Sequence, residues 1–165
     1  MINKFYFLGQ CLLGGEAKKK VIARSRWVGE KAEYFINGFL GELVAERYLT
    51  ECQGYDIKVS HKQNLIYEWN DSYQHLDKEP DLYIDDCGYD VKTTASTEIH
   101  NKSKIQAKAI SEGATYIIYL TGFNYRNQFS EDCCLSIETV DGAVVLDEVQ
   151  IPWSFVTTVF NELKA

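Results

Sequence analysis

The fold is decided by residues 80–93, whose sequence is PDLYIDDCGYDVKT. Two short runs of strand-forming residues, 80–84 and 89–94, stand on either side of a segment of Asp, Cys and Gly at 85–88. Strand-forming runs separated by turn-forming residues predict a β-hairpin. We therefore expect two antiparallel strands at the centre of this chain.

The pairing within this hairpin decides which side chains meet. With a four-residue turn, Asp81 lies opposite Lys92 and Tyr83 lies opposite Asp90. Opposed residues share a face of a sheet, as do residues two apart on one strand. A two-residue turn preserves this shared face, whereas a three-residue turn without a bulge destroys it. One face is therefore expected to carry Asp81, Tyr83, Asp90 and Lys92, and the other Leu82 and Val91.

Two carboxylates beside an ammonium suit the hydrolysis of a phosphodiester. The oxygens of Asp81 and Asp90 are the hard ligands that Mg²⁺ prefers. A metal-bound water is a strong nucleophile, and Lys92 could orient it and stabilise developing negative charge. The alternative is an ordinary cross-strand ion pair between Asp81 and Lys92, worth less than about 1 kcal/mol.

The remaining pattern predicts an α/β fold with a mixed central β-sheet flanked by helices. Helical spacing covers about 16–52, with a possible interruption at Asn37-Gly38, and Gly54 is a stop signal. The other expected elements are a strand at 55–60, a long loop at 61–79, a helix at 103–112 closed by Gly113, a strand at 115–121, a hairpin from 135–140 and 143–146, and a helix from Pro152 to 163. We expect one domain over 1–165, with its core at roughly 37–121 and a peripheral hairpin and helix at 134–164.

Composition limits the classes of function. The net charge of −7 argues against a protein that coats nucleic acid by bulk electrostatics. It is compatible with a metal-dependent nuclease, because bound divalent ions mask an acidic cluster. Basic residues gather at 18–26 and at 102–108, and either group could contact phosphates or form a solvated helix face.

Cysteine spacing and hydropathy exclude further classes. Five cysteines without a CxxC pair, and three scattered histidines, predict reduced thiols rather than a zinc site. No apolar run is long enough for a membrane span, and the first ten residues make a poor secretory signal. We expect a cytoplasmic protein that does not contact a membrane.

The central stretch resembles the signature of the PD-(D/E)xK nuclease superfamily, whose fold is that of many restriction endonucleases. The residues that carry the resemblance are Pro80-Asp81, then eight intervening residues, then Asp90-Val91-Lys92. A second Asp-x-Lys, Asp56-Ile57-Lys58, lacks the preceding Pro-Asp. The resemblance implies a core of helix, three antiparallel strands, helix and a further strand, which matches the expected order from about 37 to 121.

The resemblance also implies roles for individual residues. Asp81 and Asp90 would bind Mg²⁺ or Mn²⁺ with the Val91 carbonyl, and Lys92 would act on the attacking water. Family members commonly add a glutamate from the preceding helix, which matches Glu42 here, although surface glutamates are common in helices. Some add a glutamine from the following helix, where Gln106 is similarly placed.

The expected function is thus a Mg²⁺-dependent deoxyribonuclease acting on duplex DNA, an endonuclease in preference to an exonuclease, with a homodimer as an option. A non-catalytic nucleic-acid-binding or assembly subunit of the same fold is an alternative. An RNA-directed nuclease is another.

Overall fold

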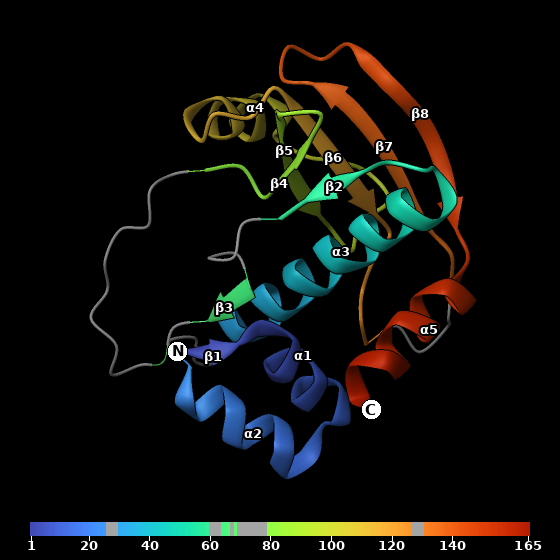
Figure 1. The fold of residues 1–165 in the computed structure, drawn as a ribbon. Helices are drawn as coiled ribbons and strands as arrows, with labels where there is room; N and C mark the ends of the chain where they lie inside the picture. The colour runs from blue at the N-terminus through green and yellow to red at the C-terminus, as the bar shows by residue number, and fades with distance from the viewer. Residues whose placement is uncertain (26–29, 60–63, 67, 69–78, 127–130) are drawn as a thin grey trace.

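The computed structural model of the 165-residue chain describes residues 1–25, 30–59, 64–66, 68, 79–126 and 131–165. These residues form a mixed α/β fold, so the predicted class is confirmed (Figure 1). The elements are β1 (Ile2–Asn3), α1 (Lys4–Leu13), α2 (Gly15–Arg24), α3 (Glu30–Cys52), β2 (Ile57–Lys58), β3 (Leu65–Ile66), β4 (Leu82–Ile84), β5 (Cys87–Thr93), α4 (Lys102–Ser111), β6 (Tyr116–Thr121), β7 (Cys133–Thr139), β8 (Val144–Ile151) and α5 (Trp153–Lys164).

The main sheet is mixed and has the strand order β2-β4-β5-β6-β7-β8. Among the strands of the described residues, only β5 and β6 pair in parallel, and α4 connects them as the crossover that parallel neighbours need. The other neighbours in this sheet pair antiparallel. The hairpin predicted around Asp141-Gly142 is present as β7 and β8, and it extends the main sheet beyond β6.

The β4–β5 hairpin closes more tightly than expected. Its turn consists of Asp85 and Asp86, with φ angles of 50° and 64°, and Ile84 pairs with Cys87. Positive φ at both central residues is the geometry of the two-residue turns that match the twist of a hairpin, and aspartate tolerates it better than most residues. The expected four-residue turn is therefore wrong.

The tighter turn shifts the strand pairing by two residues. Continuing the observed pairs brings Asp81 opposite Asp90, so the expected oppositions of Asp81 to Lys92 and of Tyr83 to Asp90 are wrong. Among the described residues, no ion pair joins Asp81 to Lys92. A shift of two keeps every side chain on its expected face, because strand side chains alternate with period two.

Helix α3 runs without a break through Asn37 and Gly38, so the expected interruption there is wrong. The Asn37 side chain instead binds the segment that follows β6. Its Nδ2 donates to the Phe123 carbonyl at 3.0 Å, and its Oδ1 accepts from the Tyr125 N–H at 2.9 Å. Asn37 therefore holds this segment against the middle of the helix.

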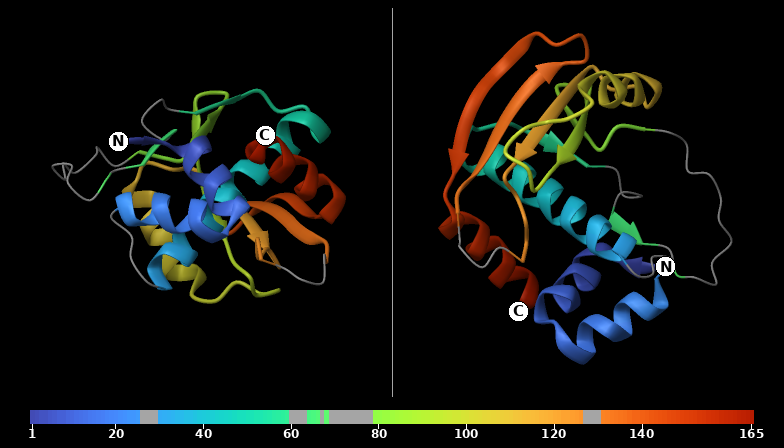
Figure 2. Two further views of the ribbon diagram at one scale, coloured as in Figure 1. Left: turned by 90° about the horizontal axis from the view of Figure 1, so that it is seen from below. Right: turned by 180° about the vertical axis from the view of Figure 1, so that it is seen from behind.

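The sheet is covered on both faces, by α3 on one and by α4 on the other (Figure 2). Buried residues of α3 such as Ile36 and Leu40 belong to the same core as Leu82 and Ile118 of the sheet. A second, smaller core lies under α4 and consists of Ala109, Ala114, Ile117 and Tyr119.

All five cysteines are free thiols, and no helix within the described residues is long and apolar enough to span a membrane.

The N-terminal residues form two helices, of which α1 was not expected. Asn3 caps α1 by accepting hydrogen bonds from the Phe5 and Tyr6 amides at 2.9 and 3.2 Å. Strand β1 pairs with β3, so part of the expected loop at 61–79 is a strand, while residues 61–63, 67 and 69–78 lie outside the described residues. Helix α1 packs against α2, α3 and α5.

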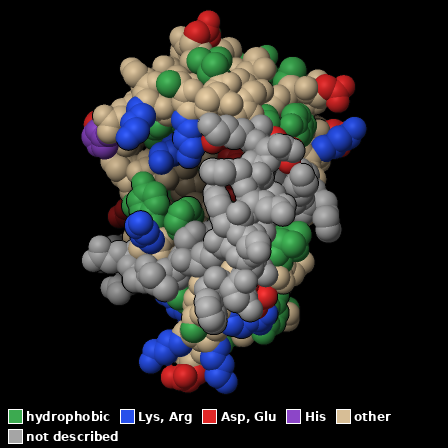
Figure 3. Space-filling model, turned by 90° about the vertical axis from the view of Figure 1, so that its left-hand side faces the viewer, with side chains coloured by type: hydrophobic (Ala, Val, Ile, Leu, Met, Phe, Trp, Pro, Cys, Tyr) green, Lys and Arg blue, Asp and Glu red, His purple; other side chains and the backbone are tan. Residues whose placement is uncertain are grey.

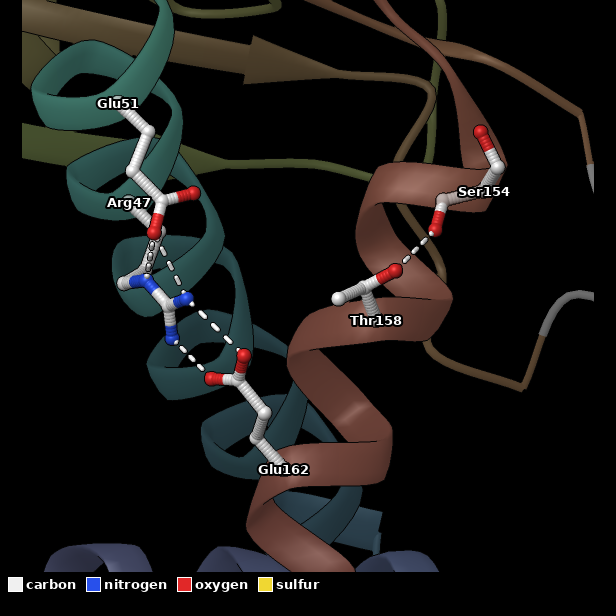
Figure 4. A network of polar contacts seen from close by, with 5 residues as sticks. All are labelled: Arg47, Glu51, Ser154, Thr158 and Glu162. Carbon is white, nitrogen blue, oxygen red and sulfur yellow. Dashed lines mark hydrogen bonds and ion pairs between the residues drawn. The ribbon is translucent and has the colours of Figure 1, made fainter.

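Helix α5 is tied to α3 by a fork of charged hydrogen bonds (Figure 4). The Arg47 guanidinium donates to Glu51, one turn further along α3, at 2.8 Å, and to Glu162 of α5 at 2.6 Å. Two parallel N–H···O bonds give such pairs a fixed geometry. Because α3 also carries residues of the cavity described next, this fork helps to fix one of its walls.

Candidate active site

A cavity of about 930 Å³ lies between α3, the second half of β5, α4 and residues 124–126. Five of the predicted site residues line it: Glu42, Asp81, Asp90, Val91 and Lys92. The face of the molecule in Figure 3 is hollowed, with acidic side chains inside the hollow and basic and hydrophobic side chains at its rim. We call this hollow the central cavity.

Asp81 is fixed by the start of the hairpin. Its Oδ2 accepts a hydrogen bond from the Val91 N–H at 2.8 Å. The N–H and C=O of one strand residue point to the same edge, so the Val91 carbonyl also points towards β4. Continued pairing places Pro80 opposite Val91, and proline has no N–H to donate to that carbonyl. The Pro80-Asp81 pair thus supplies one carboxylate and leaves the Val91 carbonyl without a backbone N–H donor at the opposite position of β4.

The carboxyl groups of the cavity come together as two neighbouring pairs. Burial raises the pKa of Asp81 well above its ordinary value, and the adjacent Glu42 carboxylate raises it further. Burial also raises the pKa of Asp90, to about 8, with the Glu112 carboxyl as the next cause. The Asp90 charge adds to the rise at Asp81, so the two pairs interact. Crowded carboxyls of this kind are stabilised by protons or by cations.

Three lysines surround these carboxyls. The Lys4 ammonium of α1 is buried, lies 3.4 Å from Glu42 Oε2 and sits 5.0 Å from the centre of the Phe39 ring. Lys108 of α4 lines the cavity and lowers the pKa of Asp90. Lys92 Nζ lies 5.9 Å from the centre of the Tyr34 ring of α3. The cavity therefore combines negative and positive groups at close range.

The residues present suit a divalent cation. Among the described residues, no three His, Cys, Asp or Glu side chains lie together as a complete metal-binding group. Mg²⁺ keeps several of its waters, however, and needs only one or two protein carboxylates. Within the described part of the chain, Asp90 Oδ1 is buried without a hydrogen-bond partner. That oxygen, the Asp81 carboxylate and the Val91 carbonyl form a set of hard donors that fits this ion.

Sequence reasoning missed Glu112 and Lys4, and it included Lys108 only as a member of the basic group at 102–108. Glu112 precedes Gly113 at the end of α4, and its distance from Lys108 of 4.0 Å reflects an ordinary i,i+4 spacing that carries no functional signal. Lys4 comes from a helix that was not predicted. Gln106 is not brought to the cavity: its Nε2 lies 3.7 Å from the place a Cβ would take on Gly142, at the turn between β7 and β8.

The far end of the cavity is held by a polar cluster around Glu33. Tyr125 donates a hydrogen bond to Glu33, and Lys18 of α2 donates to Tyr125 at 3.0 Å and lies 2.5 Å from Glu33. Against the effect of burial, the hydrogen bonds from Lys18 and Tyr125 lower the pKa of Glu33, whereas burial raises the pKa of Tyr125 to about 12. The cluster joins α2, α3 and residues 124–126 into one wall.

Comparison with protein-family models, with curated proteins and with solved structures finds no match to this chain. Function is therefore inferred from the chemistry of the central cavity.

Proposed function

We propose that the protein is a divalent-metal-dependent nuclease that hydrolyses phosphodiester bonds in DNA. The observation that carries this proposal is the meeting of Asp81, Asp90 and Lys92 in one cavity, where a buried oxygen of Asp90 has no hydrogen-bond partner among the described residues. Apart from β3, which belongs to the separate sheet with β1, the element order is α3, β2, β4, β5, α4, β6, and it supports a restriction endonuclease-like core around that cavity.

The side chains of the cavity have separable roles in such a reaction. Asp81 and Asp90, with the Val91 carbonyl, would hold Mg²⁺ or Mn²⁺, which would supply an activated water and offset charge on the phosphate. The Val91 N–H keeps the Asp81 carboxylate in place at 2.8 Å. Lys92 would orient the attacking water and stabilise the negative charge that develops on the phosphate oxygens. Glu42, next to Asp81, would bind and orient further metal-bound water.

The decisive experiment compares Lys92→Ala with Lys58→Ala on single-stranded DNA, on supercoiled and linear duplex DNA and on RNA, in Mg²⁺, in Mn²⁺ and in EDTA. Lys58 is the matched control, because it belongs to the second Asp-x-Lys of the chain and is exposed on β2. We expect cleavage by the wild type and by Lys58→Ala, none in EDTA, and a loss of at least about 100-fold in Lys92→Ala. Thermal unfolding checks that both variants fold.

Full activity in folded Lys92→Ala would refute the role of this lysine. Binding of DNA without cleavage under any metal condition would favour the alternative, a non-catalytic nucleic-acid-binding or assembly subunit. Cleavage restricted to RNA would refute the choice of DNA.

A further inference from the structure

An aromatic shelf lies beside the charged part of the central cavity. It consists of Tyr34, Phe35 and Phe39, which all come from α3 and line the cavity. Tyr34 is 71% exposed and Phe35 is 40% exposed, so both rings are accessible to a ligand in the cavity. The Phe35 and Phe39 rings stack with a centre-to-centre distance of 6.3 Å and an interplanar angle of 26°.

The shelf lies within the reach of a single nucleotide from the proposed reaction centre. The Lys92 ammonium is only 5.9 Å from the centre of the Tyr34 ring. Lys108 and Arg126 line the same cavity and can bind the flanking phosphates. A phosphate near Lys92 therefore has its own base, or the next one, close to Tyr34.

From this juxtaposition we propose that the shelf binds an unpaired nucleobase by stacking, and that the substrate is a single-stranded segment or a frayed end of DNA. The proposal rests on the proposed nuclease function. In a duplex both faces of each base are covered by neighbouring bases, so a protein ring can stack on a base only where that base is unpaired or terminal. The cavity volume, about 930 Å³, is also that of a site for a ligand of one or a few residues rather than for two paired strands.

The test uses single-stranded oligodeoxynucleotides containing 2-aminopurine, whose fluorescence falls when it stacks on an aromatic ring, and blunt duplexes of the same sequence. The variants are Tyr34→Ala, Tyr34→Phe and, as a matched control, Tyr6→Ala. Tyr6 is 55% exposed on α1 and does not line the cavity. Binding is followed in Ca²⁺ by fluorescence and anisotropy, and cleavage is measured separately in Mg²⁺.

We expect quenching and tighter binding with the single strand than with the blunt duplex. Loss of one stacked base contact weakens single-strand binding by about fivefold or more, so Tyr34→Ala should show that loss, while Tyr34→Phe keeps the ring and the binding. Tyr6→Ala should bind like the wild type. Equal binding by Tyr34→Ala and the wild type, or equal binding of single strand and blunt duplex, would overturn the proposal.

The two proposals can fail separately. Tyr34-dependent quenching without any cleavage in Mg²⁺ or Mn²⁺ would support the shelf and refute the nuclease. Cleavage that depends on Lys92 but not on Tyr34, at equal rates on single and double strands, would support the nuclease and refute the shelf.

Discussion

Gly41, which precedes Glu42 on α3, is expected to be intolerant of any side chain. A Cβ on Gly41 would lie 2.2 Å from Thr93 Oγ1, 2.5 Å from Thr93 Cγ2 and 2.9 Å from Thr93 Cβ. Because the Thr93 Cβ is fixed to β5, α3 and β5 must move apart to relieve the contact. Gly38, one turn earlier on the same helix, has no atom within 4 Å of its added Cβ. The two glycines thus form a matched pair.

The two alanine substitutions should change stability in opposite directions. Gly41→Ala should lower the free energy of unfolding by about 1–2 kcal/mol, since overpacking costs about 1–3 kcal/mol and the better helix propensity of alanine returns less than about 1 kcal/mol. Gly38→Ala should raise it by about 0.5–1 kcal/mol. For a chain of 165 residues, 1 kcal/mol corresponds to about 2–4 °C in Tm.

Urea unfolding followed by circular dichroism measures both free energies, and the cleavage assay measures the effect on the site. A shift of about 1 Å at Glu42 could lower cleavage by up to about 100-fold. Thr93→Ala removes two of the three clashing atoms. It breaks no hydrogen bond of the side chain, because Thr93 Oγ1 is buried without a partner within the described residues. The double variant Gly41→Ala/Thr93→Ala should therefore regain part of the stability that Gly41→Ala loses. Gly41→Ala as stable as Gly38→Ala would refute the close approach of α3 to β5.

Three further predictions follow from the charged groups. Because burial raises the pKa of Asp90 to about 8, the folded protein holds this proton more tightly than the unfolded chain, so the free energy of unfolding without metal should fall as pH rises from about 4 to about 8. In urea titrations, Asp90→Asn should reduce this pH-dependent fall in the free energy of unfolding. Asp56→Asn, at an exposed position of the second Asp-x-Lys, should show the same fall as the wild type. An equal fall in the two variants would contradict the prediction. Lys4→Met should lower the free energy of unfolding by about 3 kcal/mol at pH 8, because it removes the buried cation that contacts Glu42. Lys19→Met, at an exposed lysine, should lower the free energy of unfolding far less. Urea unfolding measures both, and equal losses would exclude the Lys4 contact. Arg47→Ala should cost about 1 kcal/mol or less at low salt and still less at 1 M salt, because its partners Glu51 and Glu162 are half exposed; a large loss that salt does not reduce would refute a screened ion pair.

Local patterns in the sequence predicted much of the architecture. The run at 115–121 corresponds to β6, the Asp141-Gly142 turn joins β7 to β8, and the helix after Pro152 is α5. The hairpin at 80–93 was placed with the wrong turn, yet its side-chain faces are kept, since any even shift preserves the alternation of a strand.

Contacts between distant segments were beyond the reach of the sequence. Asn37 has the residue type and place of a helix cap, but in the fold its amide binds the backbone of Phe123 and Tyr125. Gln106 has the expected position in the chain, but α4 turns it away from the central cavity and presents Lys108 instead. Helix rotation about its axis is set by packing against the sheet, which no local pattern encodes.

The sequence by itself determined that Asp81, Asp90 and Lys92 share one side of a hairpin, because strand periodicity and short turns are local properties of the chain. Only the tertiary structure decided what surrounds them. Glu42 and Tyr34 of α3 and Glu112 at the end of α4 line the same cavity, and Lys4 of α1 contacts Glu42 at its edge. These groups are brought together because α1 and α3 are buried in the core on one face of the sheet, while α4 covers the smaller core on the other face.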